Sequence, residues 1–174
     1  MNEFRVSNNR YIGDAVMRNM RYMKSRKERF AMEVIRVTEE WQRAGVHYVR
    51  TEGMVKDFNL SLEGEFDTDT PDTPYILVRD GNLPVATCRI HYLPDEQYAK
   101  IERVCTIPQY RGKGAGRLAI EEAERWIYEN GYRKIVITSR DEAVGFYQAL
   151  GYEADLEHVE TGGVFPIIYT EKHL

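Results

Sequence analysis

Two absences limit what this chain can be. The 174 residues include only two cysteines, Cys88 and Cys105, which form neither a disulfide framework nor a metal-ligand spacing. No run approaches the ~18 to 20 apolar residues that a membrane-spanning helix needs, and the charged, polar start lacks the apolar core of a signal peptide. We therefore expect a cytoplasmic protein that does not enter the membrane.

A large net charge is also missing. The net charge of -4 gives no global field that would recruit nucleic acid or an anionic membrane surface. The four histidines are scattered, and Asp67-Thr68-Asp69 is too short a fragment for a calcium loop, so we predict no metal. With 43% hydrophobic and 30% charged residues, the composition instead indicates one globular domain of ordinary size.

Charge is nevertheless uneven along the chain. A basic segment runs from Arg18 to Arg29, and an acidic segment runs from Glu63 to Asp72. We interpret the first as a solvated helix face and the second as a solvated, turn-rich loop. An alternative for the acidic segment is that it attracts a cationic amine.

Hydrophobic spacing predicts the order of elements. Residues 12–41 are expected to form a helix that ends at Ala44-Gly45, with a further short helix within 47–58. Asp80-Gly81-Asn82 indicates a hairpin between strands at 75–78 and 85–92. The remaining elements are predicted as a strand at 98–107, a helix at 117–128, a strand at 134–139, a helix from Asp141 to Leu150, and strands at 152–159 and 164–170 that turn at Gly162-Gly163.

This order predicts an α/β fold. Three antiparallel strands, then alternating helices and strands, give a mixed, mostly antiparallel sheet flanked by helices. We expect a single domain over residues 1–174, in which residues 1–45 form a helical extension. No internal repeat or low-complexity linker divides the chain.

The segment Arg111-Gly112-Lys113-Gly114-Ala115-Gly116 is the most informative stretch. It joins the strand ending at Ile107 to an amphipathic helix. Glycines let backbone N–H groups approach an anion, and the positive end of the following helix adds to that field, so the loop is suited to phosphates. A plain tight connection is the alternative reading of the glycines alone.

Two other phosphate loops do not fit. A nucleotidase P-loop needs Ser or Thr after Gly-Lys, and here Gly112-Lys113 is followed by Gly114. A dinucleotide fingerprint belongs to a first βα unit, yet this loop begins at residue 111.

Residues 107–116 resemble the acyl-CoA-binding motif of the GCN5-related N-acetyltransferases, Gln/Arg-x-x-Gly-x-Gly/Ala, with Arg111, Gly114 and Gly116 at its defined positions. A second match, Phe146-Tyr147-Gln148-Ala149-Leu150-Gly151-Tyr152, is similar to the family's Phe-Tyr-x-x-x-Gly-Phe/Tyr ending. The resemblance covers about residues 74–174. It implies the family's mixed sheet, in which the strand before the loop splays from its neighbour and the pantetheine arm of acetyl-CoA lies in the opening.

The resemblance also implies site residues. It places the pyrophosphate of acetyl-CoA on backbone groups of Arg111, Gly112, Lys113, Gly114, Ala115 and Gly116, and the pantetheine and acetyl group against Val104, Cys105 and Thr106. Arg140 stands where the family often has Asn, and its guanidinium could reach a CoA phosphate. For Cys105, a buried packing thiol is favoured over a catalytic one.

Acyl transfer to an amine needs a proton donor for the thiolate and a base for the amine. By its motif position the resemblance assigns Tyr147 as general acid, and a phenol stays protonated at neutral pH. Glu102 is the only carboxylate inside the central strand and is the candidate base if burial raises its pKa. It could instead pair with Arg103 or Lys100 while water relays the proton.

The sequence therefore favours an acetyl-CoA-dependent N-acetyltransferase that acts on a small-molecule or peptide amine in a ternary complex. A non-catalytic acyl-CoA-binding or sensing domain and an acyl-CoA-using synthase of the autoinducer type remain open. Twelve tyrosines and two tryptophans, together with the family resemblance, make a homodimer a further expectation.

Overall fold

A seven-stranded mixed sheet organises the part of the chain that the computed structural model describes, residues 32–161 and 165–174. In sequence order the strands are β1 (Glu33–Arg36), β2 (Tyr75–Asp80), β3 (Leu83–Leu93), β4 (Tyr98–Thr106), β5 (Lys134–Arg140), β6 (Glu153–Glu160) and β7 (Ile167–His173). Their order in space is β1-β2-β3-β4-β5-β7-β6, and every neighbouring pair is antiparallel except β4 and β5. The predicted mixed, mostly antiparallel sheet is confirmed.

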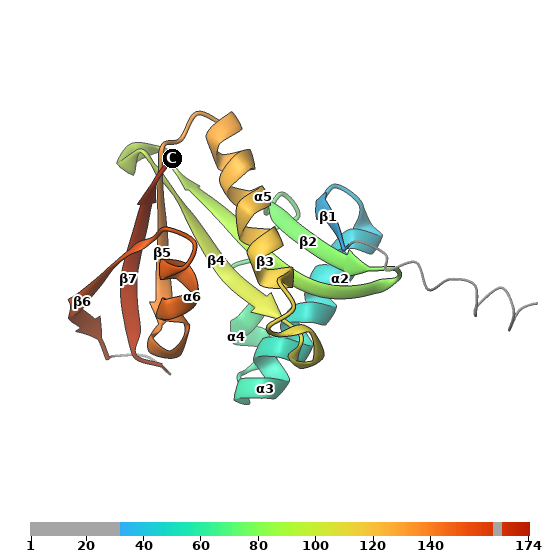
Figure 1. The fold of residues 1–174 in the computed structure, drawn as a ribbon. Helices are drawn as coiled ribbons and strands as arrows, with labels where there is room; N and C mark the ends of the chain where they lie inside the picture. Colours follow the sequence, from blue (N-terminus) through green and yellow to red (C-terminus); the bar gives the residue numbers. More distant parts are fainter. Residues whose placement is uncertain (1–31, 162–164) are drawn as a thin grey trace, which may run out of the picture. The chain divides into compact units, whose positions relative to one another are not determined.

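Helices cover both faces of this sheet. They are α2 (Glu40–Arg50), a π-helical turn at Thr51–Val55, α3 (Lys56–Phe58), α4 (Leu62–Phe66), α5 (Ala115–Glu129) and α6 (Val144–Gln148). In Figure 1, α5 crosses the near face of β2 to β4, and α2 lies on the far face. No helix in the described residues is long and apolar enough to cross a membrane.

The core lies between α5, the sheet and α2. Tyr75–Val78 of β2 and Val85–Ile90 of β3 are buried, as expected for strands covered on both faces. Helix α5 supplies an apolar stripe of Ala119, Ala123 and Ile127, each fully buried. The predicted hairpin is confirmed, and Gly81 turns it with φ +59°.

The N-terminal prediction was wrong where the structure can test it. Residues 33–36 were expected in a helix but form β1, which pairs with β2 in register Val34↔Val78. The helix α2 begins later because Gln42 accepts hydrogen bonds from the backbone of Thr38 and Glu39 in a capping box. Residues 1–31, with the basic segment Arg18–Arg29, lie outside the described residues.

The predicted helix end at Ala44-Gly45 was also wrong. Helix α2 continues through this pair to Arg50. A Cβ on Gly45 would lie 3.1 Å from Leu77 and 3.2 Å from Pro84, so the glycine lets the helix pack closely on the β2–β3 hairpin.

Near the C-terminus, one prediction fails and one is not tested. Asp141 does not cap α6; it opens a 3₁₀ turn at Asp141–Ala143, and the helix follows from Val144. Gly162 and Gly163, the predicted turn between β6 and β7, lie outside the described residues.

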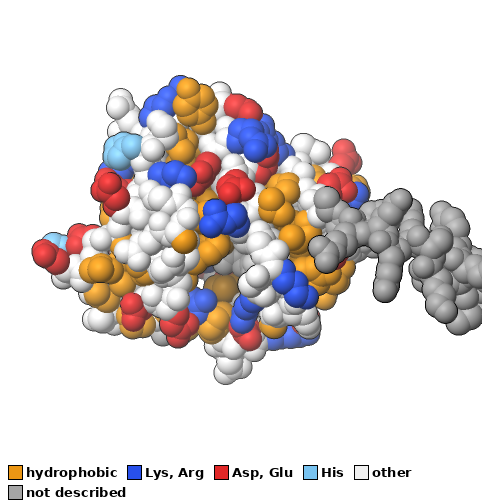
Figure 2. Space-filling view, viewed as in Figure 1, with side chains coloured by type: hydrophobic (Ala, Val, Ile, Leu, Met, Phe, Trp, Pro, Cys, Tyr) orange, Lys and Arg blue, Asp and Glu red, His pale blue; other side chains and the backbone are white. Residues whose placement is uncertain are grey.

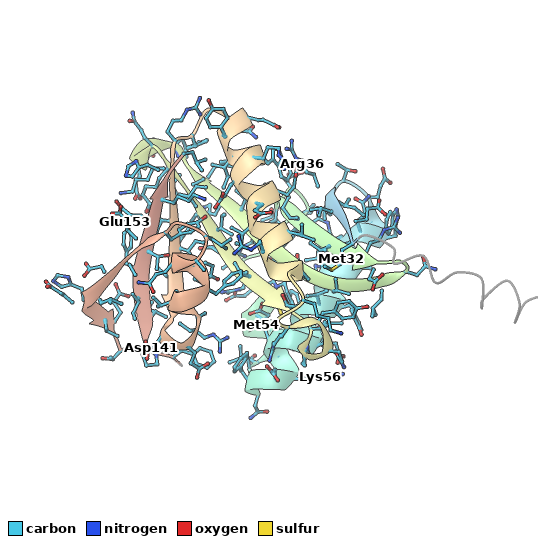
Figure 3. The ribbon with its side chains drawn as sticks, in the orientation of Figure 1. Met32, Arg36, Met54, Lys56, Asp141 and Glu153 are labelled. Carbon is cyan, nitrogen blue, oxygen red and sulfur yellow. The ribbon has the colours of Figure 1, made fainter. Side chains whose placement is uncertain are left out.

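The sheet opens between its two parallel strands. The ladder between β4 and β5 contains only the pairs Ala99↔Ile135 and Lys100↔Val136. Beyond this point the strands diverge, so the half of β4 that leads into Thr106 has no neighbour in β5. In Figure 3, Met54 and Asp141 lie on opposite sides of this opening.

Candidate functional site

Two cavities fill the opening between β4 and β5 and meet inside it. The loop cavity, of about 480 Å³, is lined by residues that include Gly53, Cys105, Thr106, Gly112, Gly114 and Gly116. The strand cavity, of about 540 Å³, is lined by residues that include Leu60, Glu65, Lys100, Glu102, Arg103 and Phe165. Five residues line both: Met54, Val104, Arg140, Ala143 and Tyr147. Figure 2 shows the hollow in this face, with Lys or Arg side chains at its margin.

The loop before α5 presents free backbone N–H groups to the loop cavity. Gly112 and Gly114 have φ of +73° and +87°, which favours glycine, and Gly114 is the N-cap of α5. The first hydrogen bond after the cap runs from Leu118 N–H to Gly114 O, so the N–H groups of residues 115–117 precede the helical ladder. The result is an anion-binding concavity at the positive end of a 15-residue helix.

Side chains of the loop brace it. The guanidinium of Arg111 bonds to Asp57 Oδ2 at 2.6 Å and tethers the loop to α3. The Nζ of Lys113 lies 4.7 Å from the ring centre of Tyr110, and Lys113 is the one member of the segment 111–116 that does not line the loop cavity.

A β-bulge interrupts β4 where the strand enters the opening. The register with β3 shifts between Thr87↔Cys105 and Arg89↔Glu102, so Arg103 and Val104 together face one residue of β3. Arg103 has φ +49°, a left-handed conformation that is uncommon for a side chain of this kind. Bulges of this kind occur next to active sites, where they redirect side chains.

Cys105 is packed, not reactive. A Cβ on Gly53, in the π-helical turn, would lie 2.5 Å from Cys105 Sγ and 2.9 Å from Thr106 O, so only glycine fits between the turn and β4. Burial raises the pKa of the Cys105 thiol to about 12, which leaves almost no thiolate at neutral pH. Val104, Cys105 and Thr106 all line the loop cavity.

An ion-pair network lies behind the strand cavity. Arg50, fully buried on α2, bonds to Glu65 Oε1 at 2.8 Å and also contacts Asp69. Asp69 in turn bonds to Arg89 at 2.8 Å, and Arg89 bonds to Glu102 at 2.6 Å. The interpretation of the acidic segment as a solvated loop is therefore wrong for Glu65 and Asp69, since both point inward onto arginines.

This network sets the charge state of Glu102. Burial acts to raise the pKa of its carboxyl, but the hydrogen bond and charge of Arg89, with the charge of Lys100, outweigh burial and lower it. The condition set for Glu102 as the base, a pKa raised by burial, is therefore not met, and the alternative pairing with Lys100 is found at 3.5 Å. Glu102 lines the strand cavity as an ionised group, and its partner, Arg89, was not foreseen.

Tyr147 lies where the two cavities meet. Its side chain is only 6% exposed and packs edge-on against Phe146 and Tyr152. Burial raises the pKa of the Tyr147 phenol, while the positive charge of Arg140 acts in the opposite sense. The phenol is therefore a protonated donor at neutral pH.

Arg140 lines both cavities beside two aromatic rings. Its guanidinium lies 4.1 Å from the ring centre of Phe58 and 5.2 Å from that of Phe165, and Nη1 lies 3.5 Å from Glu142. The sequence had pointed to Arg140 but not to Phe58 or Phe165. Within the described residues, no cluster of three or more His, Cys, Asp or Glu is placed to hold a metal ion.

Comparison with known proteins assigns the chain to one protein family. The family described as "Acetyltransferase (GNAT) family" matches residues 35–152. YjcF of Bacillus subtilis, named an uncharacterized N-acetyltransferase, is 29% identical over 133 residues, covering 75% of this chain and 94% of YjcF.

Solved structures with a similar fold include N-acetyltransferases. A candidate N-acetyltransferase from Lactobacillus plantarum has a TM-score of 0.75 and 29% identity, covering 83% of this chain and 99% of the other. The PaiA N-acetyltransferase of Thermoplasma acidophilum, solved in complex with coenzyme A, has a TM-score of 0.64 and 14% identity, covering 83% of this chain and 100% of the other. At that identity, the second likeness shows the fold alone.

Proposed function

Because the chain belongs to the acetyltransferase (GNAT) family, we propose that it transfers the acetyl group of acetyl-CoA directly to a primary amine, with both substrates bound at once. The observation that carries this proposal is the meeting of the two cavities at Tyr147. A donor in the loop cavity and an acceptor in the strand cavity would bring thioester and amine together there. No covalent acyl-enzyme is needed, and Cys105, the thiol nearest the site, is held in its inert form.

The donor side follows from the loop. We assign the pyrophosphate of acetyl-CoA to the N–H groups of Gly112 and of residues 114–117, and the pantetheine arm to Val104, Cys105 and Thr106. The coenzyme A bound to the fold-related Thermoplasma acidophilum enzyme supports this choice of donor. Arg140, which lines the same cavity, is assigned to the donor as well.

The transfer step can be written with the residues present. The amine nitrogen attacks the thioester carbon, and the oxyanion that forms is stabilised by backbone N–H groups that the β4 bulge leaves out of the ladder. As the C–S bond breaks, the Tyr147 hydroxyl donates a proton to the sulfur. The proton lost by the amine passes to water, and the ionised Glu102 in the cavity wall can accept a hydrogen bond from that water.

Release of the free CoA thiol tests this function. Incubation of the protein with acetyl-CoA and a panel of primary amines, polyamines and peptides should release CoA with at least one acceptor. Tight binding of acetyl-CoA without release by any amine would overturn the proposal in favour of a non-catalytic acyl-CoA sensor.

Acetyl-CoA should raise the melting temperature of the wild type, and Gly114→Val should abolish that rise. A valine cannot easily adopt φ +87°, so the N–H groups of the loop would be displaced. Gly131→Val is the matched control, because Gly131 also has positive φ and an open surrounding but follows the opposite end of the 15-residue α5. Thermal unfolding with and without acetyl-CoA measures both. If acetyl-CoA raises the melting temperature of Gly114→Val as much as that of the wild type, the assignment of this loop to the donor site is wrong.

The pH dependence of kcat/KM between pH 6 and 9 should reflect the acceptor amine, not Glu102. Because the pKa of Glu102 is lowered from its usual 4.5, the carboxylate is already ionised throughout this range. The rate should therefore rise with pH as the amine loses its proton, and Glu102→Gln should lower the rate without moving the midpoint. If the pH midpoint of kcat/KM is absent in Glu102→Gln, the Glu102 carboxyl itself titrates between pH 6 and 9, and the prediction is wrong.

A further inference from the structure

We propose that the amine acceptor carries an anionic group, most simply a carboxylate, and that Arg103 binds it. This inference rests on the proposed function, since it takes the strand cavity as the acceptor site. Its starting point is the charge on the wall of that cavity. Three cations and two carboxylates line it: Lys100, Arg103, Arg140, Glu65 and Glu102.

Both carboxylates have a partner outside the cavity, and Glu102 also lies 3.5 Å from Lys100 in the cavity wall. Glu65 bonds to Arg50, and Glu102 bonds to Arg89, and neither arginine lines the cavity. These arginines share Asp69 between them.

The full set of charges also includes the exposed Glu142 beside Arg140. It then holds five cations and four carboxylates, namely Arg50, Arg89, Lys100, Arg103 and Arg140 against Glu65, Asp69, Glu102 and Glu142. One positive charge is therefore in surplus at the cavity.

Arg103 and Arg140 hold the least committed of these charges. The Nε of Arg103 lies 3.3 Å from Glu65 Oε2 but makes no hydrogen bond, and no other partner of its guanidinium is found in the described residues. Arg140 Nη1 also makes no hydrogen bond, but its guanidinium packs on the rings of Phe58 and Phe165, and Arg103 has no such contact in the described residues.

By contrast, Arg50 and Arg89 each bond to two carboxylates. A guanidinium with unused N–H groups at a cavity wall is suited to bidentate recognition of a carboxylate.

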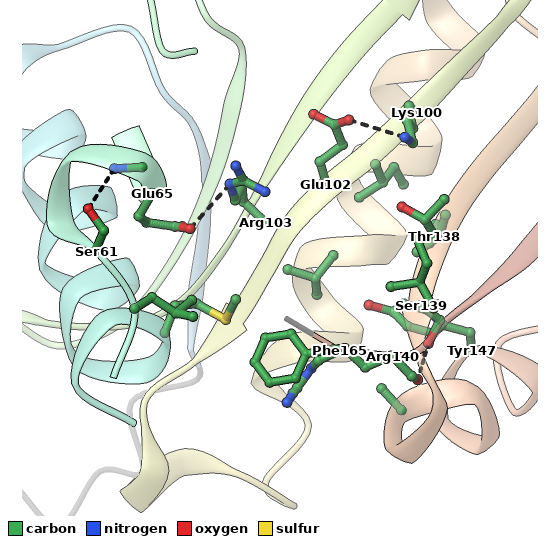
Figure 4. A pocket seen from close by; sticks show the side chains of 18 residues that line it. Ser61, Glu65, Lys100, Glu102, Arg103, Thr138, Ser139, Arg140, Tyr147 and Phe165 are labelled. Atoms are coloured by element: carbon green, nitrogen blue, oxygen red, sulfur yellow. Dashed lines mark hydrogen bonds and ion pairs between the residues drawn. The ribbon is translucent and has the colours of Figure 1, made fainter. Parts of the chain in front are cut away.

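The bulge is what directs Arg103 into the cavity. Successive residues of a regular strand point to opposite faces of the sheet. Glu102 contacts Arg89, and its strand neighbour Arg103 contacts Glu65. Arg89 and Glu65 belong to the same ion-pair network on one face of the sheet, so Glu102 and Arg103 both point to that face. The φ of +49° at Arg103 therefore places two adjacent side chains on the acceptor side. Figure 4 shows Arg103 and Glu65 pointing toward one another, with Tyr147 and Arg140 across the cavity.

The same backbone conformation of Arg103 also carries an energetic cost. A non-glycine residue in the left-handed region costs about 1 kcal/mol or more and persists where the surroundings or function require it. The surplus positive charge also acts on the substrate, because a nearby cation lowers the pKa of a bound amine and so favours its nucleophilic, uncharged form.

Matched substrates test this inference. The probes are ω-amino acids of increasing length, from glycine upward, each compared with its carboxamide, in steady-state CoA release at saturating acetyl-CoA. Calorimetric binding of the same pairs to the CoA-bound protein gives a readout without turnover. At the best spacing, kcat/KM for the acid should exceed that for the amide by about 10- to 100-fold, the range for a charged hydrogen bond. The amide's amine is the less basic, so protonation cannot produce this preference.

Three variants connect the preference to Arg103. Arg103→Gln should remove the discrimination between acid and amide, and Arg103→Lys should keep part of it. The fold should survive both changes, since Glu65 retains its bond to Arg50. Arg125→Gln, on the exposed side of α5, is the control and should discriminate like the wild type.

The outcomes separate the two proposals. Amides used as well as acids, or discrimination that survives Arg103→Gln, would overturn the inference and leave the acetyltransferase proposal standing. If no amine releases CoA, the acetyltransferase proposal fails. The calorimetric binding data then still test the inference about Arg103. Acids that bind more tightly than amides to the wild type but not to Arg103→Gln would support an anionic ligand. Equal binding of acids and amides would overturn the inference.

Discussion

Replacing Tyr147 with phenylalanine is expected to lower kcat by ~10²- to 10⁴-fold, the usual contribution of general acid catalysis. The substitution keeps the ring that packs against Phe146 and Tyr152 and removes only the hydroxyl where the two cavities meet. Acetyl-CoA affinity should therefore remain close to that of the wild type. Initial rates of CoA release with an accepted amine, together with titration of acetyl-CoA, measure the two quantities separately.

A matched tyrosine separates chemistry from general damage. Tyr128 on α5 is 51% exposed and lines neither cavity, so Tyr128→Phe should leave kcat unchanged. If Tyr147→Phe keeps the wild-type kcat, another group or water protonates the thiolate and the assignment of Tyr147 is wrong.

The largest effect on stability is expected at Arg50. Arg50→Leu should lower the free energy of unfolding by about 3–5 kcal/mol, because it leaves the buried Glu65 and Asp69 without a partner that bonds to both. The same change also removes hydrogen bonds to the Tyr75 hydroxyl and to the backbone of Glu65. Urea unfolding followed by circular dichroism measures the loss.

Two comparisons show whether the cost comes from the orphaned charge. Arg125→Leu removes an exposed pair with Glu122 and should cost at most about 1 kcal/mol. The double variant Arg50→Leu with Glu65→Leu should be more stable than Arg50→Leu alone, because it also removes the buried carboxylate that would keep only its longer contact with Arg103. An Arg50→Leu loss no larger than that of Arg125→Leu would mean that the network contributes little to the fold.

The features that could be predicted from the sequence are those with a local cause. The turn at Gly81, the loop with Gly112 and Gly114, and the end of α5 at Glu129, one residue beyond its predicted end, each follow from what a few neighbouring residues permit in φ and in hydrogen bonding. Residues 33–36 failed because their apolar spacing also suits a helix. They form a strand because they pair with β2, whose partner residues lie 40 to 46 positions further along the chain.

The acceptor side could not be predicted for the same reason. Arg50 lies four residues after Val46 on the buried stripe of α2, which was a signal for an inward charge, but its partners Glu65 and Asp69 come from another segment. The bulge at Arg103 carries no glycine to mark its positive φ. Only the register of β3 against β4 reveals it.

The two cavities draw on different stretches of the chain, and this has an evolutionary consequence. Four of the thirteen residues that line only the strand cavity lie in 60–65, a stretch that contributes nothing to the loop cavity, which depends mainly on 105–117. Substitutions in the first stretch can therefore alter the choice of acceptor while the donor half is inherited unchanged. A lineage built on this arrangement can acquire new amine substrates by drift in one short helical segment, without having to rebuild its use of the acyl donor.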